Sequence, residues 1–152
     1  MEKFYADFLD KLGAIHSEIA DLILPLPLEA LDWQPLPDIP SICVLVVHIV
    51  GAEKYWVGDV IAGKNTGRIR EKEFKSKGKS VEELIAGLGE SRSFIQAIFS
   101  DMGIGDLSRS CISPRDGSET TVAWALNHAI HHSALHLGHI QIIRQLWESG
   151  NH

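Results

Sequence analysis

Hydrophobic residues recur at intervals of three and four along four stretches of the chain, which is the spacing of an amphipathic helix. The first stretch begins near Phe4 and ends before Pro25, because proline cannot continue a helix. The second begins near Ser41, a residue type that caps helix N-termini well, and continues to about Ala62. We expect a helix over each of these stretches.

The other two periodic stretches lie in the second half of the chain. Ser80 is followed three residues later by Glu83, the pattern of a capping box, and apolar positions then recur until Gly103. The longest stretch runs from about Thr120 to Glu148. The sequence therefore predicts four helices in total.

The segments between these helices differ in character. Four prolines between Pro25 and Pro37 exclude a continuous helix there, although residues 28–31 could form a single turn. Residues 64–79 are polar and mixed in charge, which indicates a long solvated crossover, and residues 107–119 are rich in turn formers. No segment alternates with period two over any length, so we expect no convincing strand, although the chain could extend briefly at Ile112.

These elements predict an all-α four-helix bundle that forms a single domain over residues 1–152. The long connection between the second and third helices would allow these two helices to run parallel. With 45% hydrophobic and 22% charged residues, the chain can bury a full core without disulfides.

Charge and hydropathy exclude two classes of partner. The net charge of −6 argues against sequence-independent binding to nucleic acid, which needs a basic surface. The longest apolar run, Ile42 to Val47, is too short to cross a bilayer. Two cysteines, Cys43 and Cys111, do not make a disulfide framework, and the N-terminus does not resemble a leader. We therefore expect a soluble cytoplasmic protein.

Histidine is concentrated in the fourth predicted helix, which holds five of the eight histidines between positions 128 and 139. At about 100° per residue, four of them fall within roughly 80° of one another, whereas His131 lies on a different side. The same stripe carries Leu135, Ile143 and Leu146, so we expect it to face the core. The four histidines of the stripe are His128, His132, His136 and His139.

A divalent metal ion is one way to satisfy several buried imidazole rings at once. Residues at i and i+4 lie one helical turn apart, so both rings can reach the same ion. The spacing allows the pairs 128/132, 132/136 and, more loosely, 136/139, and does not choose among them. His48, which interrupts an apolar run on the second helix, is the candidate for a third ligand from another helix.

Three segments together resemble the DinB-like superfamily of metal-binding four-helix proteins. The proline-rich segment Leu26–Pro35 is similar to the loop that follows the first helix in that family. His48 with Trp56 eight residues later is similar to its second-helix signature, and His132-x3-His136-x-Gly138 to its fourth-helix signature. Relatives include the N-terminal domain of mycothiol-dependent maleylpyruvate isomerase and bacillithiol transferases.

The resemblance implies an up-down-down-up bundle with a metal triad of His48, His132 and His136. His128 and His139 would then support the ligands from outside, or act as alternative ligands. Three neighbouring side chains are also candidates by their angular positions. Tyr55 either borders the pocket or packs in the core, Trp124 forms a pocket wall, and Glu53, about 140° from His48, is a solvated or interface carboxylate.

The ion implied by three neutral imidazoles is one divalent transition metal, with zinc first and nickel or iron as further possibilities. The resemblance implies an enzyme of thiol S-transfer or hydrolysis type that acts on small electrophilic molecules, with a low-molecular-weight thiol such as bacillithiol or mycothiol as cosubstrate. No catalytic side chain is identified. The alternatives are a non-catalytic metal-binding or ligand-binding stress-response protein, and a bundle whose histidines are purely structural.

We also expect a homodimer, by analogy with the family and because the chain has more apolar residues than one bundle readily hides. The residues that suggested this surplus are Trp56, Val57, Val60, Ile61 and Trp147.

Overall fold

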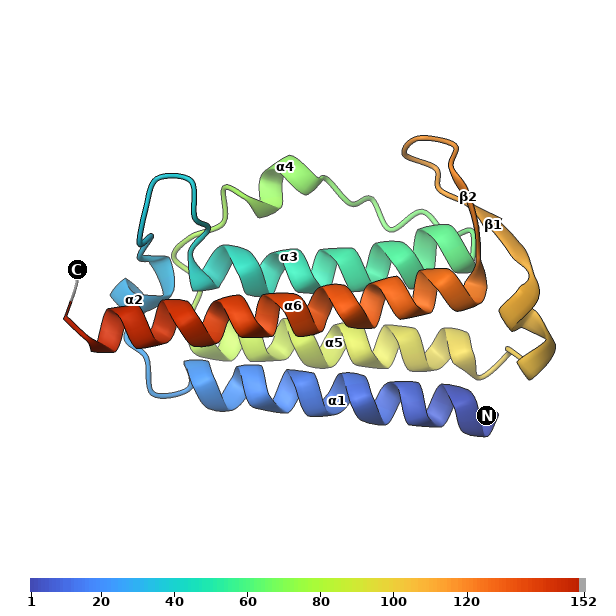
Figure 1. The fold of residues 1–152 in the computed structure, drawn as a ribbon, viewed down its shortest axis with the longest axis horizontal. Coiled ribbons are helices and arrows are strands. Elements are labelled where there is room, and N and C mark those ends of the chain that lie inside the picture. Colours follow the sequence, from blue (N-terminus) through green and yellow to red (C-terminus); the bar gives the residue numbers. More distant parts are fainter. Residues whose placement is uncertain (151–152) are drawn as a thin grey trace.

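Four long helices form the protein in a computed structural model of the 152-residue chain, in which residues 1–150 are described (Figure 1). These are α1 (Lys3–Ile23), α3 (Ile42–Lys54), α5 (Val81–Phe99) and α6 (Val122–Glu148). In Figure 1, α3 and α5 run in one direction while α1 and α6 run in the other. The prediction of an all-α four-helix bundle with parallel second and third helices is confirmed.

The helix ends follow the predicted capping. The Ser41 hydroxyl accepts a hydrogen bond from the Val44 amide, and Ser80 and Glu83 form the reciprocal capping box. α3 does not stop at Lys54 but continues as a π-helical segment, η1 (Tyr55–Ile61), and Gly63 follows with φ +62°. The second predicted helix is thus α3 and η1 together.

Short elements occupy the connections. α2 (Leu28–Asp32) is the turn expected between the prolines, α4 (Arg70–Glu73) lies in the crossover from η1 to α5, and the 3-10 helix η2 (Ile104–Ser108) follows α5. Figure 1 shows the crossover passing over α3, with α4 near its middle. The crossover was expected to be solvated throughout, which is wrong at Glu73, because this side chain is buried.

The expectation that no convincing strand forms is also wrong. β1 (Ser110–Ile112) pairs antiparallel with β2 (Glu119–Thr121), with Cys111 opposite Thr120. Each strand has three residues, which is too short for alternation to be visible in the sequence. The hairpin projects beyond the end of the bundle and leads directly into α6 (Figure 1).

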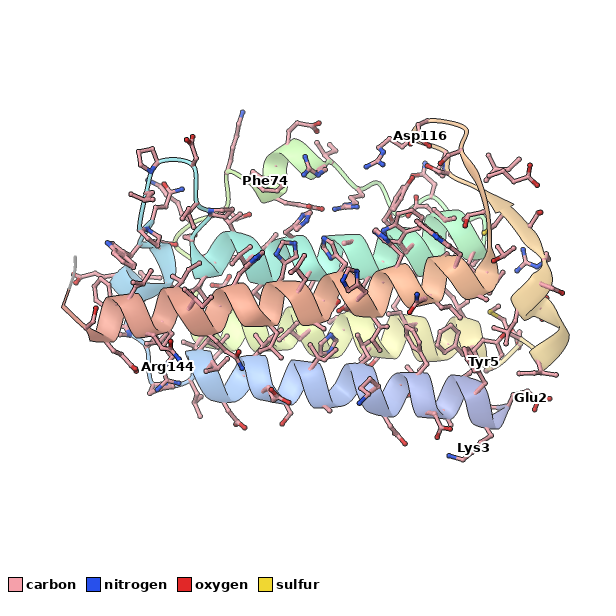
Figure 2. The ribbon with its side chains drawn as sticks, viewed as in Figure 1. Glu2, Lys3, Tyr5, Phe74, Asp116 and Arg144 are labelled. Carbon is pink, nitrogen blue, oxygen red and sulfur yellow. The ribbon has the colours of Figure 1, made fainter. Side chains whose placement is uncertain are left out.

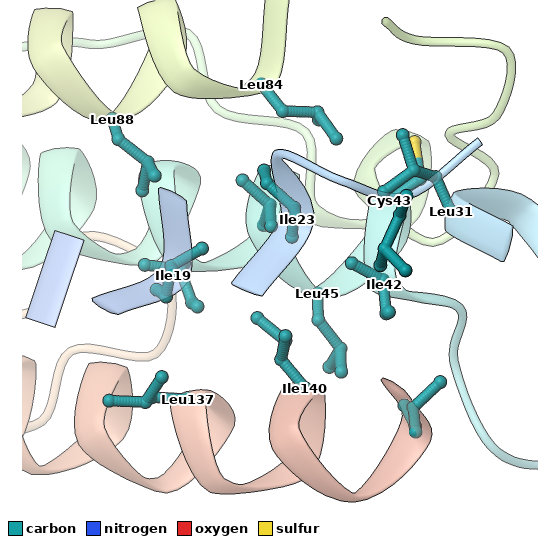
Figure 3. Close-up of a cluster of buried hydrophobic side chains, with 14 of the residues drawn as sticks. Ile19, Ile23, Leu31, Ile42, Cys43, Leu45, Leu84, Leu88, Leu137 and Ile140 are labelled. Atoms are coloured by element: carbon teal, nitrogen blue, oxygen red, sulfur yellow. The ribbon is translucent and has the colours of Figure 1, made fainter. Parts of the chain in front are cut away.

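Two groups of buried hydrophobic side chains make up the core. The first joins α1, α2, α3, α5 and α6 and includes Ile19, Ile42, Leu88 and Ile140 (Figure 3). The second lies towards the hairpin end and centres on Tyr5, which hydrogen-bonds to the Gly103 carbonyl. Each fully buried side chain of this kind stabilises the fold by about 1.5–3 kcal/mol. Cys43 and Cys111 are buried free thiols.

A polar cluster lies inside the bundle around Glu53, which the sequence predicted as a solvated or an interface carboxylate. Glu53 is only 1% exposed, so the solvated alternative is wrong. Its two oxygens accept hydrogen bonds from Ser91 and Ser133, and both lie within 3.1 Å of His16 Nε2. The partners come from α1, α5 and α6, so this one carboxylate ties α3 to the other three long helices.

The apolar surplus that suggested a dimer is smaller than expected. Val57, Val60 and Ile61 are buried within the chain, and Trp147 packs against Trp33 with ring centroids 5.7 Å apart. The homodimer therefore stays a prediction that loses much of its original support. Across the described residues, no helix has the length and apolar character needed to span a membrane.

Candidate metal centre

His48 is held in one orientation by a carboxylate from the crossover. The His48 side chain is buried in the middle of α3, and its Nδ1 donates a hydrogen bond to Glu73 Oε2 at 2.7 Å. Because a carboxylate accepts here, the ring proton resides on Nδ1 and the Nε2 lone pair remains free. This tautomer is the one that a metal ligand requires at Nε2.

Glu73 is itself fixed by an arginine. Arg68 Nε lies 2.6 Å from Glu73 Oε1 and Arg68 Nη2 lies 3.0 Å from Oε2, a bidentate pair. Burial alone would raise the pKa of Glu73, but the hydrogen bonds from His48 and Arg68 outweigh it and lower the pKa below its ordinary value. Glu73 is therefore a carboxylate at neutral pH.

Gly51 leaves the space that this carboxylate occupies. It lies three residues after His48 on α3, and a Cβ added there would overlap with the Glu73 carboxylate. Only glycine allows the crossover to approach α3 this closely at this position.

Two histidines of α6 meet His48 at its free nitrogen. His132 Nε2 lies 3.0 Å from His48 Nε2 and 3.1 Å from His136 Nε2. Ligand atoms of the three residues all lie within 4.8 Å of one another. The structure thus brings together His48, His132 and His136 and chooses the 132/136 pair among those that the spacing allowed.

The two α6 rings are uncharged at neutral pH. Burial is the main cause that lowers the pKa of His132 to about 3, and the neighbouring rings of His136 and His48 lower it further. Burial likewise lowers the pKa of His136 to about 4, with the fields of His48 and His139 adding to the effect. Both rings therefore offer lone pairs rather than positive charges.

The converging nitrogens fit a metal ion better than they fit hydrogen bonds. His48 Nε2 carries no proton, so a proton on His132 Nε2 would have to serve both of the short contacts that this atom makes. A divalent ion takes one lone pair from each ring and removes this conflict.

The histidine stripe was predicted to face the core. In the structure it lies at the border of the core instead. The buried residues of α6 form a different stripe that includes Ala129, Ser133 and Leu137, while Leu135 and Leu146 are exposed. Of the apolar residues that share the histidine stripe, only Ile143 is buried. Two of these histidines, His132 and His136, instead lie beside the His48 ring of α3.

His128 and His139 lie on either side of the triad. The His128 ring stacks on Trp124 with centroids 5.0 Å apart and packs against Trp56, and its centroid is 6.2 Å from that of His132. His139 Nδ1 lies 3.2 Å from His136 Nδ1, on the opposite side of that ring from the cluster. His139 is thus placed to orient His136, whereas His128 contributes no nitrogen to the cluster.

The predicted pocket residues have separate roles. Trp124 is half exposed and covers His128 as an outer wall. The Tyr55 hydroxyl lies 2.7 Å from the Ser113 hydroxyl, which links η1 to the hairpin, and the Tyr55 ring borders a cavity beside Arg68. Tyr55 therefore both packs and lines a cavity.

Two cavities lie beside the centre. One of about 300 Å³ is lined mainly by apolar side chains, among them Leu45, Ile142 and Leu146, together with His136 and His139. The other, of about 310 Å³, lies between the crossover, η1 and the hairpin. A small molecule could therefore be bound next to the histidines.

The residues that support His48 from the crossover were not identified by the sequence analysis. Glu73, Arg68 and Phe74 lie in a polar segment without periodicity. Phe74 lies between α4 and α3, with its ring centroid 5.0 Å from that of His48 (Figure 2). A metal-binding histidine commonly has a carboxylate at its other nitrogen, but the sequence analysis identified no such partner for His48.

Solved structures share this fold. A conserved protein from Enterococcus faecalis has a TM-score of 0.80 at 14% identity, covering 96% of this chain and 98% of that chain. YfiT from Bacillus subtilis, described as "a probable metal-dependent hydrolase with an unusual four-helix bundle topology", has a TM-score of 0.76 at 15% identity, covering 97% of this chain and 90% of its own. A DinB-like protein from Bacillus cereus has a TM-score of 0.73 at 18% identity, covering 94% and 91%.

At these identities the structural likeness establishes the fold alone. No curated protein matches the sequence. The sequence does match the DinB superfamily model over residues 12–140, which is most of the chain, and the protein therefore belongs to the DinB superfamily.

Proposed function

We propose that the protein binds one divalent transition-metal ion through His48, His132 and His136 and uses it as an enzyme on small electrophilic molecules. The observation that carries the proposal is the orientation of His48. Its Nδ1 donates to Glu73, and its Nε2 meets His132 Nε2 at 3.0 Å. A carboxylate behind a histidine whose other nitrogen faces two further histidines supports a metal centre at this place.

Zinc is the first candidate for the ion. Imidazole ligands suit zinc, nickel and iron, whereas magnesium and calcium prefer oxygen. Three protein ligands are the number found in catalytic zinc sites, which keep a further position for water or substrate.

The proposed reaction is thiol S-transfer or hydrolysis. When bound, a divalent ion of this kind lowers the pKa of a water or thiol and thereby supplies a nucleophile at neutral pH. Glu73 keeps the His48 proton on Nδ1 and fixes the ring, and His139 does the same for His136 through a 3.2 Å contact between the Nδ1 atoms. The resemblance to bacillithiol and mycothiol enzymes favours a thiol, while the description of YfiT favours hydrolysis.

The apolar cavity supports an enzyme over a protein that only stores metal. His136 and His139 form part of its lining, and Leu45, Ile142 and Leu146 line it with hydrocarbon. This cavity would hold the apolar part of an electrophile next to the ion and exclude water from it.

Metal analysis of the purified protein tests the first half of this proposal. We expect about one zinc ion per chain for the wild type and a sharp loss in His48→Ala, His132→Ala and His136→Ala. His131, exposed on the same helix, provides the matched control, and His131→Ala should keep its metal. Unchanged metal content in all three ligand variants would contradict the proposal.

Activity measurements test the second half. The zinc-loaded protein is incubated with monobromobimane and L-cysteine, and in parallel with a p-nitrophenyl ester, and each product is followed optically. Acceleration of either reaction by the wild type but not by His132→Ala supports catalysis. A protein that binds zinc and accelerates neither reaction would instead favour the non-catalytic binding protein.

A further inference from the structure

Three arginines line the cavity between the crossover, η1 and the hairpin. Arg68 and Arg70 come from the crossover and Arg115 from the hairpin, while Asp59 and Glu71 also border this space of about 310 Å³. In a protein with a net charge of −6, a cavity with more arginines than carboxylates needs an explanation.

Two of the charged groups in this cavity already have partners. Arg68 forms the bidentate pair with Glu73. Asp59 accepts a hydrogen bond from the Thr66 amide at 3.1 Å and another from the Thr66 hydroxyl. These groups build the cavity wall and are not available to a ligand.

Arg70 and Arg115 are the arginines whose charges remain available. Within the described part of the chain, no carboxylate lies within ion-pair distance of Arg70, whose guanidinium lies 4.6 Å from the centroid of the Phe74 ring. Arg115 has one long ion pair, 3.6 Å to Asp116 at the tip of the hairpin (Figure 2). Asp116 also accepts hydrogen bonds from the amide and hydroxyl of Ser118, which hold the pKa of its carboxyl well below the usual range.

The arginine cavity lies close to His48, because Arg68, which lines it, has its Nη2 3.5 Å from His48 Nδ1. The Arg70 guanidinium lies over the Phe74 ring. The same Phe74 ring contacts the His48 ring, with ring centroids 5.0 Å apart. On the other side, the field of Arg115 reaches His128, whose pKa is lowered first by burial, then by His131 and then by Arg115. A molecule bound by these arginines would therefore lie beside the residues that hold His48.

We propose that this cavity binds an anionic group, a carboxylate or a phosphate, of the small molecule that reacts at the histidine cluster, with Arg70 and Arg115 as the binding residues. A guanidinium stacked on an aromatic ring keeps its N–H edge free, and this edge matches a planar carboxylate or a phosphate. The proposal rests on the proposed function for the reacting end of the substrate. It adds that the preferred substrates carry a negative charge at one end and hydrocarbon near His136 and His139.

Calorimetric titration with inorganic phosphate and with succinate tests the anion site. The proteins are the wild type, Arg70→Gln, Arg115→Gln and the control Lys72→Gln, which removes one positive charge from an exposed position of α4 outside the cavity. We expect at least one probe to bind the wild type. Each arginine variant should weaken that binding by about tenfold, the effect of one charge-assisted hydrogen bond, and Lys72→Gln should leave it unchanged.

His132→Ala separates this proposal from the metal proposal, because it removes a ligand of the ion without touching the cavity. Anion binding retained in this variant supports the arginine site even if metal analysis contradicts the metal centre. Equal affinities in the wild type and both arginine variants would overturn the proposal. Binding lost only in His132→Ala would also overturn it, since the anion would then be bound by the ion.

Discussion

Two buried histidine–carboxylate pairs occur in this protein, and we expect them to have different roles. His16 and Glu53 meet inside the bundle at 2.9 Å, and His48 and Glu73 meet at its edge at 2.7 Å. All four side chains are less than one-tenth exposed. Burial and pairing alone therefore do not distinguish a structural pair from a functional one.

The partners of each pair make the difference. Glu53 accepts from serines of α5 and α6 as well as from His16, so its oxygens are occupied by the helices that surround it. Glu73 instead comes from the crossover, and the histidine it holds turns its other ring nitrogen towards His132. A buried histidine–carboxylate pair indicates a site when the second ring nitrogen faces further ligands.

Removal of Glu53 should have the largest effect on stability. Glu53→Ala leaves His16, Ser91 and Ser133 without their acceptor and should lower the free energy of unfolding by about 3–5 kcal/mol. Urea denaturation measures this loss, with Glu18→Ala at an exposed position of α1 as the control. The milder Glu53→Gln should remain folded and keep one metal ion per chain; loss of metal with full stability in this variant would reverse the roles of the two pairs.

Neutralisation of Glu73 should affect the metal rather than the fold. Glu73→Gln keeps the shape of the side chain but removes the charge behind His48, and should weaken zinc binding by about 10–100-fold. Competition with a chromophoric chelator measures this affinity. Glu71→Gln, at an exposed position of the same short helix, should bind zinc as the wild type does, and equal affinities for both variants would contradict the role assigned to Glu73.

A methyl group at Gly51 on α3 should disturb the contact between Glu73 and His48. Gly51→Ala places a Cβ where the Glu73 carboxylate lies, so the carboxylate must withdraw and zinc affinity should fall by about tenfold. In Gly89→Ala the new Cβ meets nothing within 4 Å, and a helical alanine should stabilise the protein by about 0.5–1 kcal/mol. Unchanged zinc affinity in Gly51→Ala would show that the close approach of the crossover is dispensable.

The pH dependence of the metal-free protein should reflect the low pKa values at the centre. Unfolded His132 and His136 bind protons near pH 6.5, whereas in the folded protein their pKa values are about 3 and about 4. Between these values the unfolded state holds up to two more protons, so stability should fall as the pH drops from about 6.5 towards about 4. Glu73 adds to this at the acid end, since its pKa is lowered on folding and its contribution is lost as the pH falls through the folded value.

Urea unfolding at several pH values measures this slope. The double variant His132→Ala with His136→Ala should show a shallower fall, and the exposed His131→Ala should leave the slope unchanged. The assigned pKa values would be contradicted if the double variant and the wild type lost stability in parallel.

The sequence was informative where local rules decide the structure. Periodicity and capping residues such as Ser41 and Ser80 located the long helices, and the resemblance of His48, His132 and His136 to a family signature chose the residues that meet in the structure. These features depend on neighbouring positions along one helix, which the sequence displays directly.

The angular position of a residue on its helix did not predict its solvent exposure where several other elements pack around that helix. α3 contacts α5, α6, α2 and α4, so it has almost no solvated face, and an offset from His48 could not place Glu53 in water. The burial of Glu73 depends on the crossover folding back over α3, a long-range event without a local signal. The three-residue strands β1 and β2 were too short to show a pattern.

X-ray absorption at the zinc edge of the loaded protein tests the central claim most directly, because it reports the number and type of atoms bound to the ion. The account predicts three imidazole nitrogens at about 2.0–2.1 Å with a further light atom, and no sulfur, since Cys43 and Cys111 are buried away from the cluster. In His132→Ala the three-imidazole signature should disappear, while in His131→Ala it should remain. A sulfur shell, or a spectrum that is identical in all three proteins, would contradict the assignment of His48, His132 and His136 as the ligands.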